Sequence, residues 1–194
     1  MKGTKEIWYN HWRHVKPKSY LIANPSRSLM LVEAVNALGL DNPSILEIGC
    51  NCGRNLEHLR QAGYTDLHGV EISQQAIDMM QAEHPELYDM ATIHVSPIEE
   101  IIKTIGQYDV IYTMAVLMHI HDSSEWIFSY MAKACRKNLI TIEKERGGAK
   151  NAKARHYGRV FHRRGFAEIR TVEVSHKIIA PGHGAHYIMR VFEK

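Results

Sequence analysis

The sequence predicts an α/β protein built on one doubly wound, mixed sheet of seven strands, with helices at the N-terminus. Between residues 44 and 143, short runs rich in β-branched residues alternate with helical stretches, which is typical of βαβ units with right-handed crossovers. The last two runs are longer and are joined by a loop close to hairpin length, so we expect this pair to be antiparallel. A length of 194 residues suits a single domain, with residues 1–40 as a helical cap and residues 41–194 as the core.

Two helices are predicted before the sheet. Residues 4–15 carry apolar side chains at helical spacing, and Pro17 ends this helix because the residue before a proline avoids helical backbone angles. The second helix follows Asn24, with Pro25 in its first turn and Gly39 as its stop.

The sheet and the helices that connect its strands are predicted from the alternating pattern. The first five strands are expected at residues 44–49, 66–72, 92–95, 108–113 and 138–143. The helices between them are expected at residues 54–62, 74–83, 97–104 and 123–136. A helix near residues 152–165 and two strands at 167–175 and 185–193 complete the chain.

Composition and charge exclude several classes of protein. The hydrophobic fraction of 45% and the charged fraction of 23% are those of a globular protein, and no run of about 18 apolar residues predicts a membrane span. The opening stretch MKGTKEIWYNHWRH lacks the features of a secretory signal, and three cysteines do not suit a disulfide framework, so we expect a cytoplasmic protein with reduced thiols. Residues 144–164 hold eight Lys and Arg against one acid, Glu145, which predicts either a solvated surface or a surface for an anionic partner.

The stretch ILEIGCNCGRN, residues 45–55, predicts a nucleotide-binding turn. It lies between the first strand and a helix, at the sheet edge where open α/β sheets bind ligands. Gly49 and Gly53 allow backbone angles that are closed to other residues, and the helix that follows offers unpaired amides. Glu71 comes 22 residues after Gly49, at the end of the second strand, where a carboxylate can accept hydrogen bonds from a ribose.

The identity of the nucleotide follows from the spacing of the glycines. A dinucleotide turn, G-x-G-x-x-G, would need glycine at Asn51 and Arg54. The stretch instead resembles the first motif of the class I S-adenosylmethionine-dependent methyltransferases, E/D-x-G-x-G-x-G, which reads Glu47, Gly49, Asn51 and Gly53. Asn51 stands at the middle glycine, and Asn best tolerates a left-handed conformation after Gly. The resemblance covers roughly residues 40 to 145, and the stretch TMAVLMHI is similar to the VLEHI common in the family.

This resemblance implies a Rossmann-like sheet of strand order 3-2-1-4-5-7-6 with an antiparallel last strand, and S-adenosylmethionine as the cofactor, with S-adenosylhomocysteine as its product. It places Glu47 near the methionine amino group of the cofactor, Glu71 on the ribose and Ile72 beside the adenine. The residues that it implies for cofactor binding are Glu47, Gly49, Cys50, Asn51, Gly53, Asn55, Glu71, Ile72, Ser96, Pro97, Ile98, Thr113, Met114 and Ala115.

The acceptor side has two candidate catalytic residues and a set of aromatic residues. The resemblance places His119 on this side, as a general base, an acceptor-orienting group or a structural tie, and Glu143 ends the fifth strand at the same rim. Glu143 is the second candidate, with a solvated strand-end acid as the alternative. The aromatic residues of the entry segment either pack as a helix or cover the acceptor; they are Trp8, Tyr9, Trp12 and Tyr20.

Thiol and metal chemistry are weaker interpretations of the sequence. Cys50 and Cys52 lack the second pair of ligands that a zinc site needs, so we interpret them as turn residues with small side chains. The HIHD stretch at residues 119–122 and the loop histidines His183 and His186 fix no third ligand, and we predict no metal.

We therefore expect a methyltransferase that acts on an N or O nucleophile of a small molecule. The stretch TMAV replaces the N/D-P-P-Y/F signature of methylases that act on the exocyclic amines of bases, and no appended recognition domain is evident. Two alternatives stay open: a methyltransferase for RNA or another anionic polymer that uses residues 144–164, and a non-catalytic partner subunit that keeps the cofactor site. No membrane partner is expected, and the oligomeric state is left open.

Overall fold

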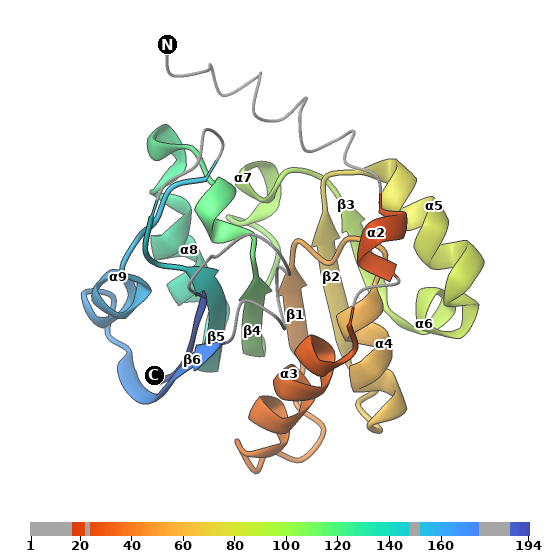
Figure 1. Cartoon of the computed structure of the whole chain (residues 1–194), viewed down its shortest axis with the longest axis horizontal. Coiled ribbons are helices and arrows are strands. Elements are labelled where there is room, and N and C mark those ends of the chain that lie inside the picture. The colour runs from red at the N-terminus through yellow and green to blue at the C-terminus, as the bar shows by residue number, and fades with distance from the viewer. Residues whose placement is uncertain (1–16, 22–23, 148–151, 175–186) are drawn as a thin grey trace. The chain divides into compact units, whose positions relative to one another are not determined.

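A computed structural model describes residues 17–21, 24–147, 152–174 and 187–194. Their strands form a seven-stranded sheet of order β3-β2-β1-β4-β5-β7-β6 (Figure 1). This order, and the antiparallel pairing of β7, confirm the predicted fold class. The predicted helix over residues 4–15 lies outside the described residues. The residues cluster in two compact units, Met1–Ile101 and Ile102–Lys194, here called the N-terminal and the C-terminal unit, and the single-domain organisation stays a prediction.

The N-terminal unit holds three parallel strands. They are β1 (Ile45–Ile48), β2 (Leu67–Glu71) and β3 (Thr92–Val95). The helices are α2 (Lys18–Leu21), α3 (Ser26–Asn36), α4 (Arg54–Gln61), α5 (Gln74–Glu83), α6 (Pro85–Met90) and α7 (Ile98–Ile101). All four residues of β1 are buried, as expected for a parallel strand with both faces covered. α3 packs beside α4, and α5 beside α6 (Figure 1).

The C-terminal unit holds four strands, of which the last in the chain runs antiparallel to the others. They are β4 (Tyr108–Met114), β5 (Cys135–Lys144), β6 (Ala167–Val174) and β7 (Tyr187–Glu193). β4 and β5 are parallel, whereas β7 runs antiparallel to both β5 and β6. The helices are the 3₁₀ turns η1 (Leu117–His119) and η2 (Asp122–Ser124), then α8 (Ile127–Ala134) and α9 (Tyr157–His162).

Aromatic rings fill the core of the C-terminal unit. The ring centroid of Phe161 lies 5.5 Å from that of Phe192, 6.1 Å from that of Phe128 and 6.2 Å from that of Phe166. These contacts join α8 and α9 to β7, and burial of rings of this size contributes strongly to stability. The N-terminal unit is packed instead with aliphatic side chains such as Ile45, which is fully buried.

Several predicted boundaries were wrong. The helix expected over residues 152–165 covers only Tyr157–His162, because the residues before it run along the segment after β4 and bond to it. The helix expected at residues 123–136 begins at Ile127, after η2, and ends at Ala134, where β5 starts earlier than predicted. Helix α7 is shorter than expected, and α6 was not predicted, although Pro85 stands in its first turn.

No helix among the described residues is long and apolar enough to cross a membrane.

Candidate active site

The loop between β1 and α4 is a turn built on left-handed residues. The φ angles of Gly49, Asn51 and Gly53 are +80°, +48° and +76°, which confirms that Asn51 adopts the left-handed conformation predicted for it. The amides of Gly49 and Cys50 donate to the Val70 carbonyl oxygen at 2.8 and 3.1 Å. The turn is thus fastened to the neighbouring strand β2.

Gly53 is required in this turn for a second reason. A Cβ atom at this position would lie 2.8 Å from Met80 Cε and 2.9 Å from Leu87 Cδ2. The α4 backbone therefore approaches α5 and α6 more closely than a side chain would allow. This close approach fixes the direction of the amides at the start of α4, which are the groups that bind anions and polar ligands at a helix N-terminus.

Glu71, at the end of β2, stabilises the turn directly. Its carboxylate accepts hydrogen bonds from the amides of Asn51 and Ser73, each at 2.9 Å. Burial raises the pKa of this carboxyl, and the backbone hydrogen bonds oppose that shift. A carboxylate has about four acceptor positions, so its two oxygens keep capacity for the hydroxyl groups of a ribose. Glu71 therefore fits the sugar-binding role that its spacing predicts.

A chain of polar contacts joins the turn to the helices that precede β1. The Asn55 side chain donates to Glu47 Oε1 at 2.8 Å and accepts from the Ser28 hydroxyl at 2.8 Å. The Arg54 guanidinium donates to that hydroxyl at 3.1 Å and to the Tyr20 carbonyl oxygen at 2.9 Å. The residues on α2 and α3 are thereby anchored to the turn. Ser28 was not identified from the sequence, since its partners lie 26 and 27 residues away.

The cysteines of the turn pack inside the N-terminal unit. Both Cys50 and Cys52 are buried, and burial raises the pKa of each thiol. A Cβ on Gly69 would lie 2.7 Å from Cys50 Sγ, so this thiol packs directly against β2. Cys52 Sγ contacts the Pro17 carbonyl oxygen at 3.9 Å. A thiol that is buried and protonated is a poor nucleophile or metal ligand.

The end of β3 provides the residues expected at the adenine. The Ser96 amide donates to the Glu71 carbonyl oxygen at 2.9 Å, and its hydroxyl donates to the Pro97 carbonyl oxygen at 3.1 Å. Pro97 and Ile98 are buried, whereas Ile72 and Ser96 are half-buried. These residues thus follow directly on the strand ends that position Glu71.

In the C-terminal unit, β4 ends in a strained turn. Thr113 and Met114 are buried, and Ala115 has a φ of +58° with its amide bonded to the Ile142 carbonyl oxygen at 2.9 Å. A non-glycine residue in this region costs about 1 kcal/mol or more. His119 follows on η1, half-buried, with its amide bonded to the Val116 carbonyl oxygen at 2.9 Å.

Glu143 is fully buried and binds backbone amides rather than solvent. Its carboxylate accepts from the amides of Val116, Leu117 and Met118 at 2.9, 3.0 and 3.3 Å. Burial raises the pKa of Glu143 to about 7, opposed by these hydrogen bonds. This geometry favours a positioning role over that of a base in contact with an acceptor.

Other predicted residues are placed less fully. Trp8, Tyr9 and Trp12 lie outside the described residues, and Tyr20 is half-buried on α2. Burial raises the pKa of the Tyr20 phenol, with smaller effects from the charges of Arg27, Glu71 and Cys52.

The metal hypothesis gains no support from the described residues. They hold no group of three or more His, Cys, Asp or Glu that could bind a metal ion. His183 and His186 lie outside the described residues.

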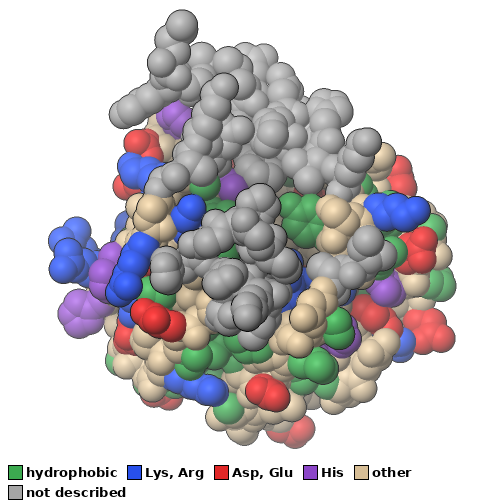
Figure 2. All heavy atoms as spheres, in the orientation of Figure 1, with side chains coloured by type: hydrophobic (Ala, Val, Ile, Leu, Met, Phe, Trp, Pro, Cys, Tyr) green, Lys and Arg blue, Asp and Glu red, His purple; other side chains and the backbone are tan. Residues whose placement is uncertain are grey.

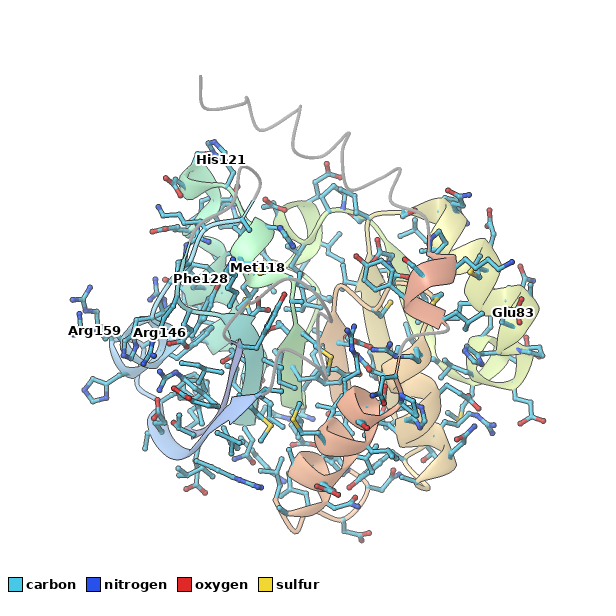
Figure 3. All side chains as sticks on the ribbon, viewed as in Figure 1. Glu83, Met118, His121, Phe128, Arg146 and Arg159 are labelled. Carbon is cyan, nitrogen blue, oxygen red and sulfur yellow. The ribbon has the colours of Figure 1, made fainter. Side chains whose placement is uncertain are left out.

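The basic segment forms an exposed surface on α9. Figure 2 shows Lys, Arg and His side chains gathering where α9 lies, and Arg159 extends outward from this helix (Figure 3). The exposed residues of this surface are His156, Arg159, His162 and Arg163. In contrast, Arg155 of the same segment turns inward and is 7% exposed, which the sequence pattern did not indicate.

Known proteins share this fold. A family model described as a methyltransferase domain matches residues 23–138, and no curated protein sequence matches the chain. The magnesium protoporphyrin IX methyltransferase ChlM from Synechocystis PCC 6803, solved with S-adenosylhomocysteine, is similar over 98% of this chain and 99% of that chain, with a TM-score of 0.79 and 15% identity.

Two further solved structures are similar in fold to this chain at 14% sequence identity. A putative sarcosine dimethylglycine methyltransferase from Galdieria sulphuraria has a TM-score of 0.69 over 87% of this chain and 85% of that chain. A putative RNA methyltransferase from Pyrococcus horikoshii has a TM-score of 0.66 over 98% of both chains. The fold is common to all of them, and with the family match over more than half of its length, this chain belongs to the class I S-adenosylmethionine-dependent methyltransferases.

Proposed function

We propose that this protein transfers the methyl group of S-adenosylmethionine to an N or O nucleophile of a small molecule. The observation that carries the proposal is the left-handed turn at Gly49, Asn51 and Gly53, fastened by the Glu71 carboxylate through the Asn51 amide. This turn presents backbone amides and a carboxylate with remaining acceptor capacity, which suits an adenosyl ligand.

Residues of the N-terminal unit would hold the cofactor. Glu71 would bind the ribose hydroxyls, and Glu47, oriented by Asn55, would lie near the amino group of the methionine portion. Ile72 and the stretch from Ser96 to Ile98 would flank the adenine. The bound cofactor supplies a methyl group that its positively charged sulfur already activates, so the protein chiefly aligns the two reactants and keeps water out.

Residues of the C-terminal unit would serve the acceptor. Thr113, Met114 and Ala115 are the candidates for the region of the sulfonium, at the strained end of β4. His119 is the candidate for a base or an acceptor-orienting group, because an ordinary imidazole titrates near neutral pH. A base is needed only for an acceptor that carries a proton at neutral pH.

Similarity to ChlM supports a small-molecule acceptor. That structure covers nearly all of both chains, and its name assigns it a magnesium protoporphyrin as substrate. The name of the Galdieria sulphuraria protein also refers to small molecules, sarcosine and dimethylglycine. These names motivate the choice of acceptors for a first screen.

A second candidate function is methylation of RNA or another anionic polymer. It is favoured by the α9 surface, where Arg159 and Arg163 are exposed and have no acidic partner among the described residues. Such a surface can bind phosphates, with an affinity that falls steeply as salt increases. The structural similarity to a putative RNA methyltransferase is compatible with this function.

Calorimetry with S-adenosylhomocysteine tests the cofactor site. We expect binding by the purified protein, and its absence would contradict the proposal. The acceptor is then sought with S-adenosylmethionine that carries a deuterated methyl group, added with either a small-molecule extract or total RNA, and the products are analysed by mass spectrometry. Label in a small molecule supports the proposal, and label in RNA supports the second candidate. Binding without transfer in either fraction supports the non-catalytic alternative.

A further inference from the structure

The backbone that follows β4 is capped by an acid from another strand. Glu143, on β5, accepts hydrogen bonds from the amides of Val116, Leu117 and Met118. The first amides of a helical turn have no partner within the turn, and they are usually bound by a side chain next to them. Val116 provides no such side-chain cap for η1. Glu143 therefore supplies it from a position 25 to 27 residues later in the chain.

The carbonyl groups of the same backbone are bound by the chain that follows β5. The Arg155 guanidinium donates to the carbonyl oxygens of Leu117 and Ile120 at 3.0 and 2.8 Å. The amide of Lys153 donates to the Met118 carbonyl oxygen at 2.7 Å. A carboxylate and a guanidinium thus hold the amides and the carbonyls of one short segment.

Arg155 is itself held in place by two acids. Its Nε pairs with Glu125 at 2.9 Å and its Nη2 with Asp122 at 3.3 Å, while the side chain is only 6% exposed. The Phe128 ring lies 5.7 Å from the guanidinium carbon. With partners on all sides, the planar guanidinium has a fixed orientation, which suits simultaneous binding of two carbonyl groups.

This arrangement has a free-energy cost, which points to a role beyond stability. Burial of the charges of Glu143 and Arg155 is unfavourable unless partners compensate for it, and apolar residues of similar size are often more stabilising. The segment also begins at Ala115, whose φ is +58°. Strain of this kind persists where the surroundings over-determine the backbone, and such residues cluster at functional sites.

We propose that Glu143 and Arg155 are positioning residues, which fix the backbone from Val116 to Ile120 and thereby set the place of the His119 imidazole. The inference rests on the proposed function in one respect, the assignment of His119 to the acceptor side. Neither positioning residue is available to a ligand, because Glu143 has no exposed surface and the guanidinium of Arg155 is occupied by the segment and two acids. Both act through the backbone that carries His119.

Amide hydrogen exchange and NMR of the His119 ring in the full chain test this proposal. Glu143→Gln keeps the shape of the side chain but replaces one acceptor oxygen with an NH₂ donor, which faces a backbone amide that needs an acceptor. Arg155→Lys keeps the charge but removes the planar fork of donors that reaches the Leu117 and Ile120 carbonyl groups from one fixed orientation. We expect each variant to raise the exchange rates of the amides at positions 116–118 at least tenfold and to shift the resonances of the His119 ring.

Two matched variants control for the chemistry of the substitutions. Glu193→Gln changes an exposed acid at the end of β7, and Arg136→Lys changes an exposed arginine that pairs with Asp109. We expect both variants to leave the His119 resonances in place. The amide exchange rates at positions 116–118 should stay within twofold of those of the parent. If Glu143→Gln does not fold, Arg155→Lys decides the outcome alone.

Two outcomes would overturn the proposal. If amide exchange in the variants rises evenly through the C-terminal unit, including β7, both residues stabilise the unit as a whole and do not position one segment. His119 resonances that stay in place in both variants would show that the segment does not depend on them. Binding of S-adenosylhomocysteine by the parent is measured in parallel by calorimetry. An absence of binding would count against the proposed function, and the exchange data would still decide the positioning roles.

Discussion

The two units of this protein use the same device, a strand-end glutamate that accepts backbone amides, for different purposes. Glu71 in the N-terminal unit binds backbone amides and is 7% exposed, whereas Glu143 in the C-terminal unit binds backbone amides and has no exposed surface. The acid that keeps some exposure and acceptor capacity can serve a ligand as well as the backbone. The fully enclosed acid has no surface for a ligand and acts through the residues that it holds.

The units also differ in charge. Residues 1–101 hold eight Lys and Arg and 13 Asp and Glu, which gives a net charge of −5. Residues 102–194 hold 16 Lys and Arg and eight Asp and Glu, which gives a net charge of +8. The chain's mild net charge of +3 conceals this difference. The residues proposed for the cofactor fall mostly in the acidic unit and the α9 surface in the basic one, so an anionic acceptor would be attracted to the unit that we propose for it.

The largest expected effect is the loss of cofactor affinity in Glu71→Ala. The change removes the acceptor that we propose for the ribose hydroxyls and leaves the Asn51 amide without its partner. Together these losses amount to about 3 kcal/mol, or roughly 100-fold in the Kd of S-adenosylhomocysteine. Calorimetry measures the change. Glu83→Ala, an exposed acid that extends from α5 (Figure 3), is the control and should leave the Kd unchanged. A Kd for Glu71→Ala within threefold of the parent would refute the ribose assignment.

Glu143 should make the free energy of unfolding depend on pH. The pKa of this carboxyl is 4.5 in its ordinary state and about 7 in the folded protein. The native state therefore holds the proton more tightly, so this stabilising contribution is complete below pH 4.5 and is lost as the pH rises through 7. The shift corresponds to about 3 kcal/mol at most.

Glu143→Gln removes this titration, so its free energy of unfolding should fall less than that of the parent between pH 5 and pH 8. Urea denaturation at several pH values measures both proteins, with Glu193→Gln as the control. Parallel pH dependences of parent and Glu143→Gln would mean that the buried carboxyl ionises with an ordinary pKa. The distinction between an enclosed and an accessible glutamate would then lose its energetic basis.

A smaller effect is expected from Gly53→Ala, which tests whether the cofactor turn is specified by close packing as well as by backbone angle. Gly39 has a φ of +65° and nothing within 4 Å of a Cβ, whereas Gly53 has a φ of +76° and would bring its Cβ to 2.8 Å from Met80. Gly39→Ala should destabilise the protein by about 1 kcal/mol through strain alone. Gly53→Ala should cost about 2 kcal/mol in total, since overpacking adds to the strain.

Thermal unfolding of both alanine variants gives the difference directly. Equal losses of stability would mean that Met80 and Leu87 move aside without cost, and that the turn needs glycine only for its φ angle. A weaker affinity for S-adenosylhomocysteine in Gly53→Ala, and not in Gly39→Ala, would connect the close packing of α4 with cofactor binding.

The two units were also predictable from the sequence to different degrees. In the N-terminal unit the signals are local: β-branched runs mark the strands, Asn51 tolerates the left-handed turn, and the spacing to Gly49 points to Glu71. In the C-terminal unit the decisive contacts join distant residues. Arg155 lies in a stretch whose composition predicts a helix, yet it turns inward to partners 35 and 38 residues earlier, and the helix begins only at Tyr157.

The smallest expected effect concerns the thiols, which are free and buried in the folded protein. Because Cys50, Cys52 and Cys135 are buried and burial raises the pKa of each thiol, the folded protein should react with a thiol reagent at pH 8 far more slowly than the unfolded chain. Cys50→Ala combined with Cys52→Ala should keep the Kd of S-adenosylhomocysteine within threefold, because neither sulfur is needed as a polar contact of the turn. Rapid alkylation of the folded parent that is blocked by S-adenosylhomocysteine would instead place a reactive thiol in the cofactor site. In that case the cofactor site would contain a thiol in addition to the carboxylates proposed for it.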